Sequence, residues 1–164
     1  MHYVVIDTNV LVSSLLAEHN KNNKSKPFMV MNNLFYTDNN IIPLYNQDIL
    51  DEYKDVLSRP IFGFSKLRIG KMINDFKKRA LCIDEKLSKD IIEKIEKFKF
   101  PDEDDIVFYQ VSLSRKPSYL VTGNISHFPV KPFVVTPGEY LEILKGRKIT
   151  EIRQENNIST KERK

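Results

Sequence analysis

The chain opens with MHYVVIDTNVLVSSLLA (residues 1–17), in which a carboxylate, Asp7, ends a run of β-branched residues. The apolar run at 3–6 predicts a buried strand, and the apolar pattern after Asp7 predicts a helix over 8–17. A charge placed just past a buried strand either caps the next helix or belongs to a site. The rest of the sequence has to separate these two interpretations.

Predicted strands alternate with predicted helices along the whole chain. Strands are predicted at 3–6, 41–45, 118–122 and 133–136. Helices are predicted at 8–17, 27–35, 46–59, 64–80, 88–97 and 104–115, with a last helix beginning at Pro137, and a polar loop at 19–26. Helices long enough to be crossovers indicate a parallel sheet covered on both faces. We therefore predict an α/β fold, a three-layer α/β/α sandwich with a central, mainly parallel sheet.

The length of 164 residues, with 41% hydrophobic residues, suits one domain. We place this domain at 1–145 and a basic, flexible C-terminal tail at 146–164. From Lys145 onward, seven basic residues stand against three acidic ones, so this end holds the whole net charge of +4. Such a segment either contacts phosphates through salt-dependent attraction or is a solvated, frayed terminus.

Cysteine content and hydropathy indicate a cytoplasmic protein. The single Cys82 cannot form an internal disulfide, which suggests a reducing compartment. Residues 1–17 lack a basic start and contain Asp7, so they do not match an export signal. No stretch approaches the roughly 20 apolar residues of a membrane span.

Glu52 lies on the apolar face of the predicted helix 46–59, whereas Asp48, Asp51 and Asp55 share a different face. A buried carboxylate without a partner is costly, so we expect Glu52 to have a cation or a hydrogen-bond donor.

Residues 102–105 are all acidic, and their positions relative to the apolar face of the predicted helix separate them. Asp105 lies on the packing face of the following helix because it precedes Phe108 and Tyr109 by three and four residues. Asp102 falls one turn earlier, where it lines the rim of a site or caps the helix.

Asp7, Glu52 and Asp105 thus come from three separate elements, and Asn124 follows the strand at 118–122. Ligands of parallel sheets bind outside the carboxyl ends of the strands, where Asp7 and Asn124 lie. Carboxylates gathered there repel one another unless something positive sits among them. Mg²⁺ or Mn²⁺ is the natural occupant, because both prefer oxygen ligands.

Other kinds of site match the sequence poorly. His2, His19 and His127 have no nearby His or Cys partner, so zinc is not expected. His127 either approaches the site from its rim or, as we expect, makes a local loop contact. The five glycines form neither a dinucleotide-binding nor a P-loop motif. No second aspartate follows two residues after Asp7, which argues against an aspartyl-phosphate enzyme.

Five segments together resemble the PIN-domain nucleases, in particular the branch of toxin components of toxin–antitoxin systems. They are VIDTNVLVSSLL (5–16), QDILDEYKDVLSRPIF (47–62), DDIVFYQVSL (104–113), SYLVTGNISHFP (118–129) and FVVTPGEYLEIL (133–144). The resemblance covers about residues 3–145. It implies a metal-dependent ribonuclease that leaves a 5′-phosphate and a 3′-hydroxyl, with RNA as substrate, an antitoxin protein as partner and often a homodimer.

Carried over by position, Asp7, Glu52 and Asp105 match the three acids that hold the metal in this family. Asn124 falls where many relatives have aspartate, and this loss of a charge weakens metal binding or shifts metal preference. Asn124 is therefore also the feature that favours an alternative, a catalytically impaired module that only binds RNA or protein. Among these residues we expect Asp7 and Asp105 to coordinate directly, with Glu52 acting through water.

Three further residues are candidates for support of the site. Thr8 and Asn9 open the first helix, where Asn9 is placed to hydrogen-bond Asp7 and fix its rotamer, or both simply cap the helix. Thr122 ends the strand at 118–122 and is a candidate contact to the site or to phosphate.

Overall fold

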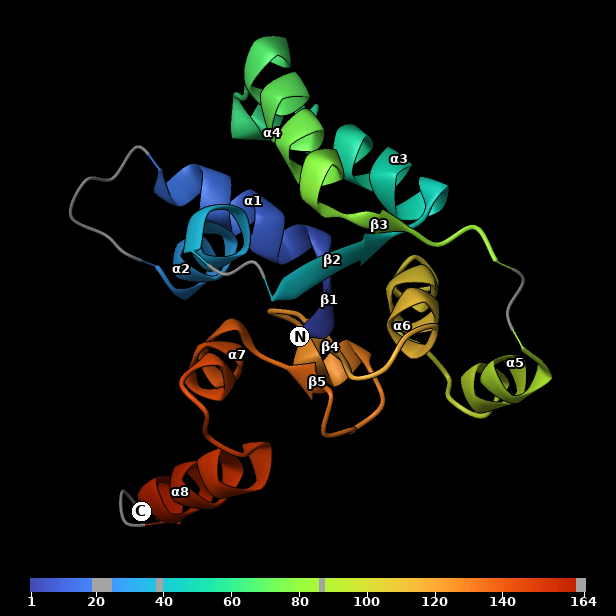
Figure 1. The fold of residues 1–164 in the computed structure, drawn as a ribbon, viewed down its shortest axis with the longest axis vertical. Helices are drawn as coiled ribbons and strands as arrows, with labels where there is room; N and C mark the ends of the chain where they lie inside the picture. Colours follow the sequence, from blue (N-terminus) through green and yellow to red (C-terminus); the bar gives the residue numbers. More distant parts are fainter. Residues whose placement is uncertain (19–24, 38–39, 86–87, 162–164) are drawn as a thin grey trace.

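The computed structural model describes residues 1–18, 25–37, 40–85 and 88–161, with side chains up to 157. Most of the polar loop predicted at 19–26, with His19, lies outside these residues. Within them, five strands form one sheet in the order β3-β2-β1-β4-β5 (Figure 1). They are β1 (His2–Ile6), β2 (Ile41–Tyr45), β3 (Leu81–Cys82), β4 (Ser118–Val121) and β5 (Val134–Val135). All four pairings are parallel, so the prediction of a mainly parallel sheet is confirmed.

Helices cover both faces of this sheet. They are α1 (Thr8–Ala17), α2 (Lys26–Asn32), α3 (Gln47–Leu57), α4 (Lys66–Arg79), α5 (Lys89–Glu96), α6 (Asp105–Leu113), α7 (Pro137–Leu144) and α8 (Ile149–Lys161). In Figure 1, α1 and α2 lie on one side of the strands and α6 on the other, with α3 and α4 near β3. α6 packs on β1, β2 and β4, and α5 packs on α6. The predicted α/β/α layering is confirmed.

β1 is the central strand, and its composition explains its place. Val4, Val5 and Ile6 are fully buried, as expected for a strand of a parallel sheet that is covered on both faces. The Tyr53 hydroxyl of α3 donates a hydrogen bond to the Ile6 carbonyl, which ties α3 to the carboxyl end of β1. Asp7 follows at this point.

Three short elements interrupt the predicted pattern. The helix predicted at 27–35 is divided into α2 and a π-helical turn, η1 (Asn33–Thr37). Two 3₁₀ turns, η2 (Pro60–Phe62) and η3 (Ile125–His127), follow α3 and β4. β3 was not predicted, because it has two residues and both are exposed.

The C-terminal segment forms α8 where the sequence analysis expected a flexible basic tail. Ile152 of α8 is buried, and Arg153 donates from Nε to Glu139 Oε1 at 2.9 Å and from Nη2 to the Val134 carbonyl at 2.8 Å. Arg147 pairs with Glu155 at 2.5 Å. Arg153 thus ties α8 to α7 and β5, which favours a structural role for this arginine over phosphate contact. Among the described residues, no helix is both long and apolar enough to cross a membrane.

Candidate active site

Asp7 lies at the carboxyl end of β1 with its side chain buried, since the residue is only 4% exposed. Although it occupies the N-cap position of α1, its side chain makes no capping hydrogen bond. Instead, Oδ2 accepts hydrogen bonds from Asn9 Nδ2 and from Thr122 Oγ1, each at 2.6 Å. The contacts anticipated for Asn9 and Thr122 are therefore present, and the Asp7 side chain does not cap α1.

The turn after β4 is locked onto the start of α1. Gly123 donates its backbone N–H to Asn9 Oδ1 at 2.8 Å, and Asn124 donates its backbone N–H to Thr122 Oγ1 at 2.9 Å. A Cβ atom at Gly123 would lie 2.9 Å from Asn9 Oδ1, closer than real Cβ contacts come. A side chain at Gly123 would therefore push the Asn9 amide aside, so the glycine allows the close approach of this turn to α1.

Glu52 projects from α3 toward the start of α1. Its side chain is half-buried and accepts a hydrogen bond from Thr8 Oγ1 at 2.6 Å. The sequence predicted that Glu52 needs a donor or a cation, and Thr8 is the donor. Asn46 caps the N-terminus of α3, because its side chain accepts a hydrogen bond from the Ile49 N–H at 3.0 Å. The helix that starts there carries Glu52 on the side that faces α1.

Asp105 is the first residue of α6, and its side chain is 14% exposed. Oδ2 lies 2.9 Å from Nδ1 of His127, which is positioned by η3. The expectation of a local contact for His127 was wrong, because its partner is 22 positions away, and the alternative that it approaches the site from its rim is what the structure shows. Asp102 Oδ1 accepts from the Asp104 N–H at 3.1 Å and thus orders the turn that leads into α6.

One cavity of about 430 Å³ brings these side chains together. Its polar lining consists of Asp7, Thr8, Asn9, Ser13, Glu52, Asp102, Asp105, Asn124 and His127, and its apolar lining of Val12, Leu16, Val56 and Phe62. All the predicted site residues are there except Thr122, which is fully buried behind Asp7. None of the described residues that line the cavity is Lys or Arg.

A second hollow of about 620 Å³ adjoins this cavity between α3 and the start of α6 and shares Glu52, Asp102 and Asp105 with it. It adds five acidic residues and one basic residue, Asp48, Asp51, Asp55, Glu103, Asp104 and Arg59. The region outside the carboxyl end of β1 is therefore strongly negative.

Burial is the main cause that raises the pKa of Asp7, Glu52 and Asp105. Hydrogen bonds from Thr122, Thr8 and His127 act in the opposite direction without cancelling it. The negative charge of Asp105 raises the pKa of Asp7 further, and that of Asp7 raises the pKa of Glu52. The carboxylates thus repel one another, and a cation among them would relieve the repulsion.

A divalent metal fits this site in donor chemistry. Carboxylate and amide oxygens are the ligands that Mg²⁺ and Mn²⁺ prefer. In the described part of the chain, no three His, Cys, Asp or Glu side chains are grouped so that they could hold a metal ion. Asp7, Glu52, Asp105 and Asn124 would therefore have to draw closer around one.

A family model described as PIN domain matches residues 3–126. This stretch runs from β1 into η3 and includes every residue proposed for the site except His127, which follows its end directly. The chain belongs to the PIN domain family. PIN domains are generally nucleases that bind nucleic acid and typically use divalent metals. None of the curated proteins with which the chain was compared matches it.

Proposed function

We propose that this protein is a metal-dependent endoribonuclease that hydrolyses RNA phosphodiester bonds with Mg²⁺ or Mn²⁺ at the acidic cavity. The observation on which this rests is the shared cavity of Asp7, Glu52, Asp105 and Asn124, supplied by four different elements of a PIN domain. Acidic side chains with no Lys or Arg among the described residues around them are poorly suited to bind a phosphate directly, but well suited to bind it through a cation.

When bound, a divalent ion lowers the pKa of a water molecule and offsets charge on the phosphate oxygens. Asp7 and Asp105 would bind the ion directly, and Glu52 would orient the attacking water and accept its proton. Asn124 would complete the ligand set with an amide oxygen. Thr8, Asn9 and Thr122 would hold the carboxylates in position through the hydrogen bonds described above.

We further propose that the enzyme is the toxin of a toxin–antitoxin pair. The resemblance of its motifs to that branch supports the proposal, and so does the strongly acidic hollow beside the cavity. A cognate antitoxin would place basic side chains among these carboxylates and exclude the metal and RNA. A homodimer belongs to the same proposal, and the exposed Ile61 and Leu67 offer an apolar face for it.

The alternative function is a PIN-like module that binds RNA or protein without cutting it. Asn124, in place of an acid, favours it, whereas the presence of the other three acids speaks against it.

The deciding experiment is cleavage of end-labelled RNA with Mg²⁺ or Mn²⁺, run beside an EDTA control. The Asp7→Asn variant tests the site, and Asp48→Asn is a matched control because Asp48 lies only in the neighbouring hollow. We expect metal-dependent cleavage that Asp7→Asn abolishes and Asp48→Asn keeps. If wild type and Asp7→Asn behave alike and calorimetry detects no Mn²⁺ binding, the binding module is the better account.

A further inference from the structure

A groove lies between α4 and η1, away from the acidic cavity. Two adjoining hollows of about 310 and 340 Å³ form it, and both are lined by Phe35, Tyr36, Lys71 and Asp75. Arg68 and Glu18 close one end of this α4–η1 groove, and Lys78 and Arg79 flank the other. The proposed chemistry at the acidic cavity uses none of these residues.

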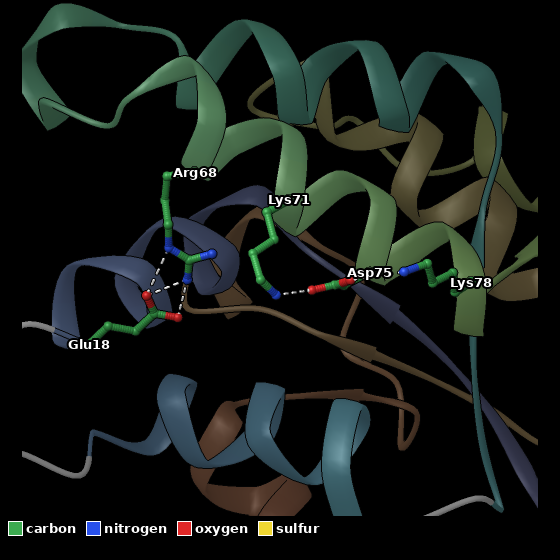
Figure 2. A network of polar contacts seen from close by, with 5 residues as sticks. All are labelled: Glu18, Arg68, Lys71, Asp75 and Lys78. Atoms are coloured by element: carbon green, nitrogen blue, oxygen red, sulfur yellow. Dashed lines mark hydrogen bonds and ion pairs between the residues drawn. The ribbon is translucent and has the colours of Figure 1, made fainter.

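The groove has an excess of positive charge, as Figure 2 shows. Lys71 and Lys78 share a single carboxylate, that of Asp75, at 2.6 and 3.5 Å. Arg68 and Glu18 form a separate pair, with Nε donating to Oε2 at 3.1 Å. The side chains of Lys71 and Lys78 remain 64% and 75% exposed, so both ammonium groups are accessible to a second partner.

The basic residues recur along one helix. α4 contains Lys66, Arg68, Lys71, Lys77, Lys78 and Arg79, with Asp75 as its one acid. A helix of this charge attracts polyanions, and successive basic side chains along it can follow a phosphate backbone.

An exposed aromatic ring lies among these charges. Tyr36, on η1, is 74% exposed and contacts Phe35 edge-on, with ring centroids 6.0 Å apart. Single π-helical turns such as η1 occur frequently at functional sites. Aromatic rings set beside basic side chains are the combination by which proteins bind single-stranded nucleic acid, because any base can stack on the ring.

The groove and the acidic cavity lie on opposite faces of α1, because residues two apart on a helix are turned about 200° from each other. Leu16 lines the cavity and Glu18, two residues later, lines the groove. Phe62 lines the cavity as well, and α4 begins at Lys66 just beyond it. The rise of a helix puts Asp7 and Glu18 about 16 Å apart along α1. A single strand that leaves the cavity past Leu16 has to pass around the end of α1 to reach the groove, so only an RNA several nucleotides longer than the cavity site spans both.

We propose that the α4–η1 groove binds a single-stranded flank of the RNA substrate. Lys71 and Lys78 contact its phosphates, and Tyr36 stacks on one of its bases. The inference rests on the proposed function for the identity of the polyanion. It assigns to this chain an RNA-binding surface distinct from the acidic cavity.

The test measures RNA binding without cleavage. A labelled single-stranded RNA long enough to span cavity and groove is titrated in EDTA and followed by fluorescence anisotropy. Lys71→Gln/Lys78→Gln should weaken binding, and the slope of the logarithm of the binding constant against the logarithm of the salt concentration should become shallower by about 0.7 per lysine lost. The control is Lys94→Gln/Lys97→Gln, at the end of α5 and its C-cap. It removes the same charge, and Lys97 pairs with Glu93 at i,i+4 spacing, as Lys71 does with Asp75. This control should bind RNA as wild type does.

Tyr36 is tested in the same assay. Tyr36→Ala should weaken binding about fivefold or more, and Tyr36→Phe, which keeps the ring, should restore it. Equal binding by the groove and control double variants would overturn the proposal, as would the absence of wild-type binding in EDTA. Melting temperatures of all variants show whether each one is folded.

Cleavage separates this proposal from the proposed function. Groove variants should lower kcat/KM on long RNA and leave cleavage of a dinucleotide unchanged. If wild type cuts RNA and the groove variants match it on both substrates, the groove proposal fails while the nuclease stands. If wild type cuts no RNA but the groove variants lose RNA binding in EDTA, the nuclease proposal fails while the groove stands.

Discussion

The hydroxyl of Thr122 donates a hydrogen bond to Oδ2 of Asp7 at 2.6 Å and joins residues 115 positions apart in the sequence. The register of the sheet explains this contact, because Ile6 pairs with Val121 and the next residue of each strand lies at the same edge. A slip of one residue between β1 and β4 would turn one of the two side chains to the other face.

Replacing Thr122 with valine keeps the shape of the side chain and removes the donor. We expect Thr122→Val to lower Mn²⁺ affinity or cleavage about tenfold, the lower end of what loss of such a supporting contact costs. Thr122→Ser keeps the hydroxyl and should behave nearly as wild type. Calorimetric Mn²⁺ titration and RNA cleavage are the measurements, and equal values for the valine and serine variants would contradict the role of the hydroxyl.

Because the pKa of Asp7 is raised, the ionised carboxylate lowers the free energy of unfolding of the metal-free protein. The folded state holds this proton to higher pH than the unfolded chain, whose aspartate pKa is near 3.8. The stability contributed at Asp7 is therefore lost as the pH rises from that value through the pKa in the folded state. In EDTA, Asp7→Asn should melt at a higher temperature than wild type near pH 7, and the difference should vanish near pH 4.

Thermal unfolding of both proteins at several pH values tests this prediction. Comparing them removes the contributions of other groups, such as Glu139, whose pKa is lowered. Adding Mn²⁺ should stabilise wild type and leave Asp7→Asn nearly unchanged. A variant that melts below wild type at neutral pH in EDTA would show that the carboxylate is already compensated.

His127 bears on the function through Asp105. His127→Ala removes the hydrogen bond to Oδ2, so the pKa of Asp105 should rise further, and Mn²⁺ affinity should fall about 10- to 100-fold. His127→Asn retains a donor at a similar position and should recover part of the loss. Mn²⁺ binding by an alanine variant equal to that of wild type would limit His127 to packing of the loop.

Gly123→Ala tests the close approach of the turn after β4 to α1. The added methyl group would displace the Asn9 side chain, which at the same time donates to Asp7. We expect a loss of cleavage of about tenfold or more with only a small change in melting temperature. Gly70→Ala is the control, because a Cβ at this glycine meets nothing within 4 Å.

Arg153 is expected to stabilise the fold without taking part in RNA binding. It donates to Glu139 and to the Val134 carbonyl, and the Glu139 side chain is 11% exposed. Hydrogen bonds to charged groups contribute about 1.5–3 kcal/mol, so Arg153→Ala should lower the free energy of unfolding by about that amount. RNA binding should not change. A loss of RNA affinity at unchanged stability would return this segment to the role of phosphate contact.

Much of the fold could be predicted because its signals are local. Each of the four predicted strands is a short apolar run. On the helices, the carboxylate that turns inward is the one that lies on the apolar face. Glu52 and Asp105 were found in this way, although each has acidic neighbours that face outward. Apolar periodicity sufficed for these helices because it reports burial directly.

The particular partners of His127 and Glu52 could not be predicted. The pairing of His127 with Asp105 depends on how η3 folds over the start of α6, and that of Thr8 with Glu52 on the packing of α1 beside α3. α8 was missed because its apolar signal is weak: Ile152 is buried, while the arginines that fix the helix look like a solvated basic tail in the sequence.

The central place of β1 has a consequence for the newly made chain. β1 is synthesised first, yet its partner β4 is made more than a hundred residues later, and the long-range pairing of parallel strands is intrinsically slow. Until Thr122 and Asn124 have left the ribosome, Asp7 lacks the surroundings that hold it. A nascent chain therefore remains without a complete site at least until everything from β1 to the turn after β4 has been made, so that the activity proposed for it would begin only when translation of the sheet is finished.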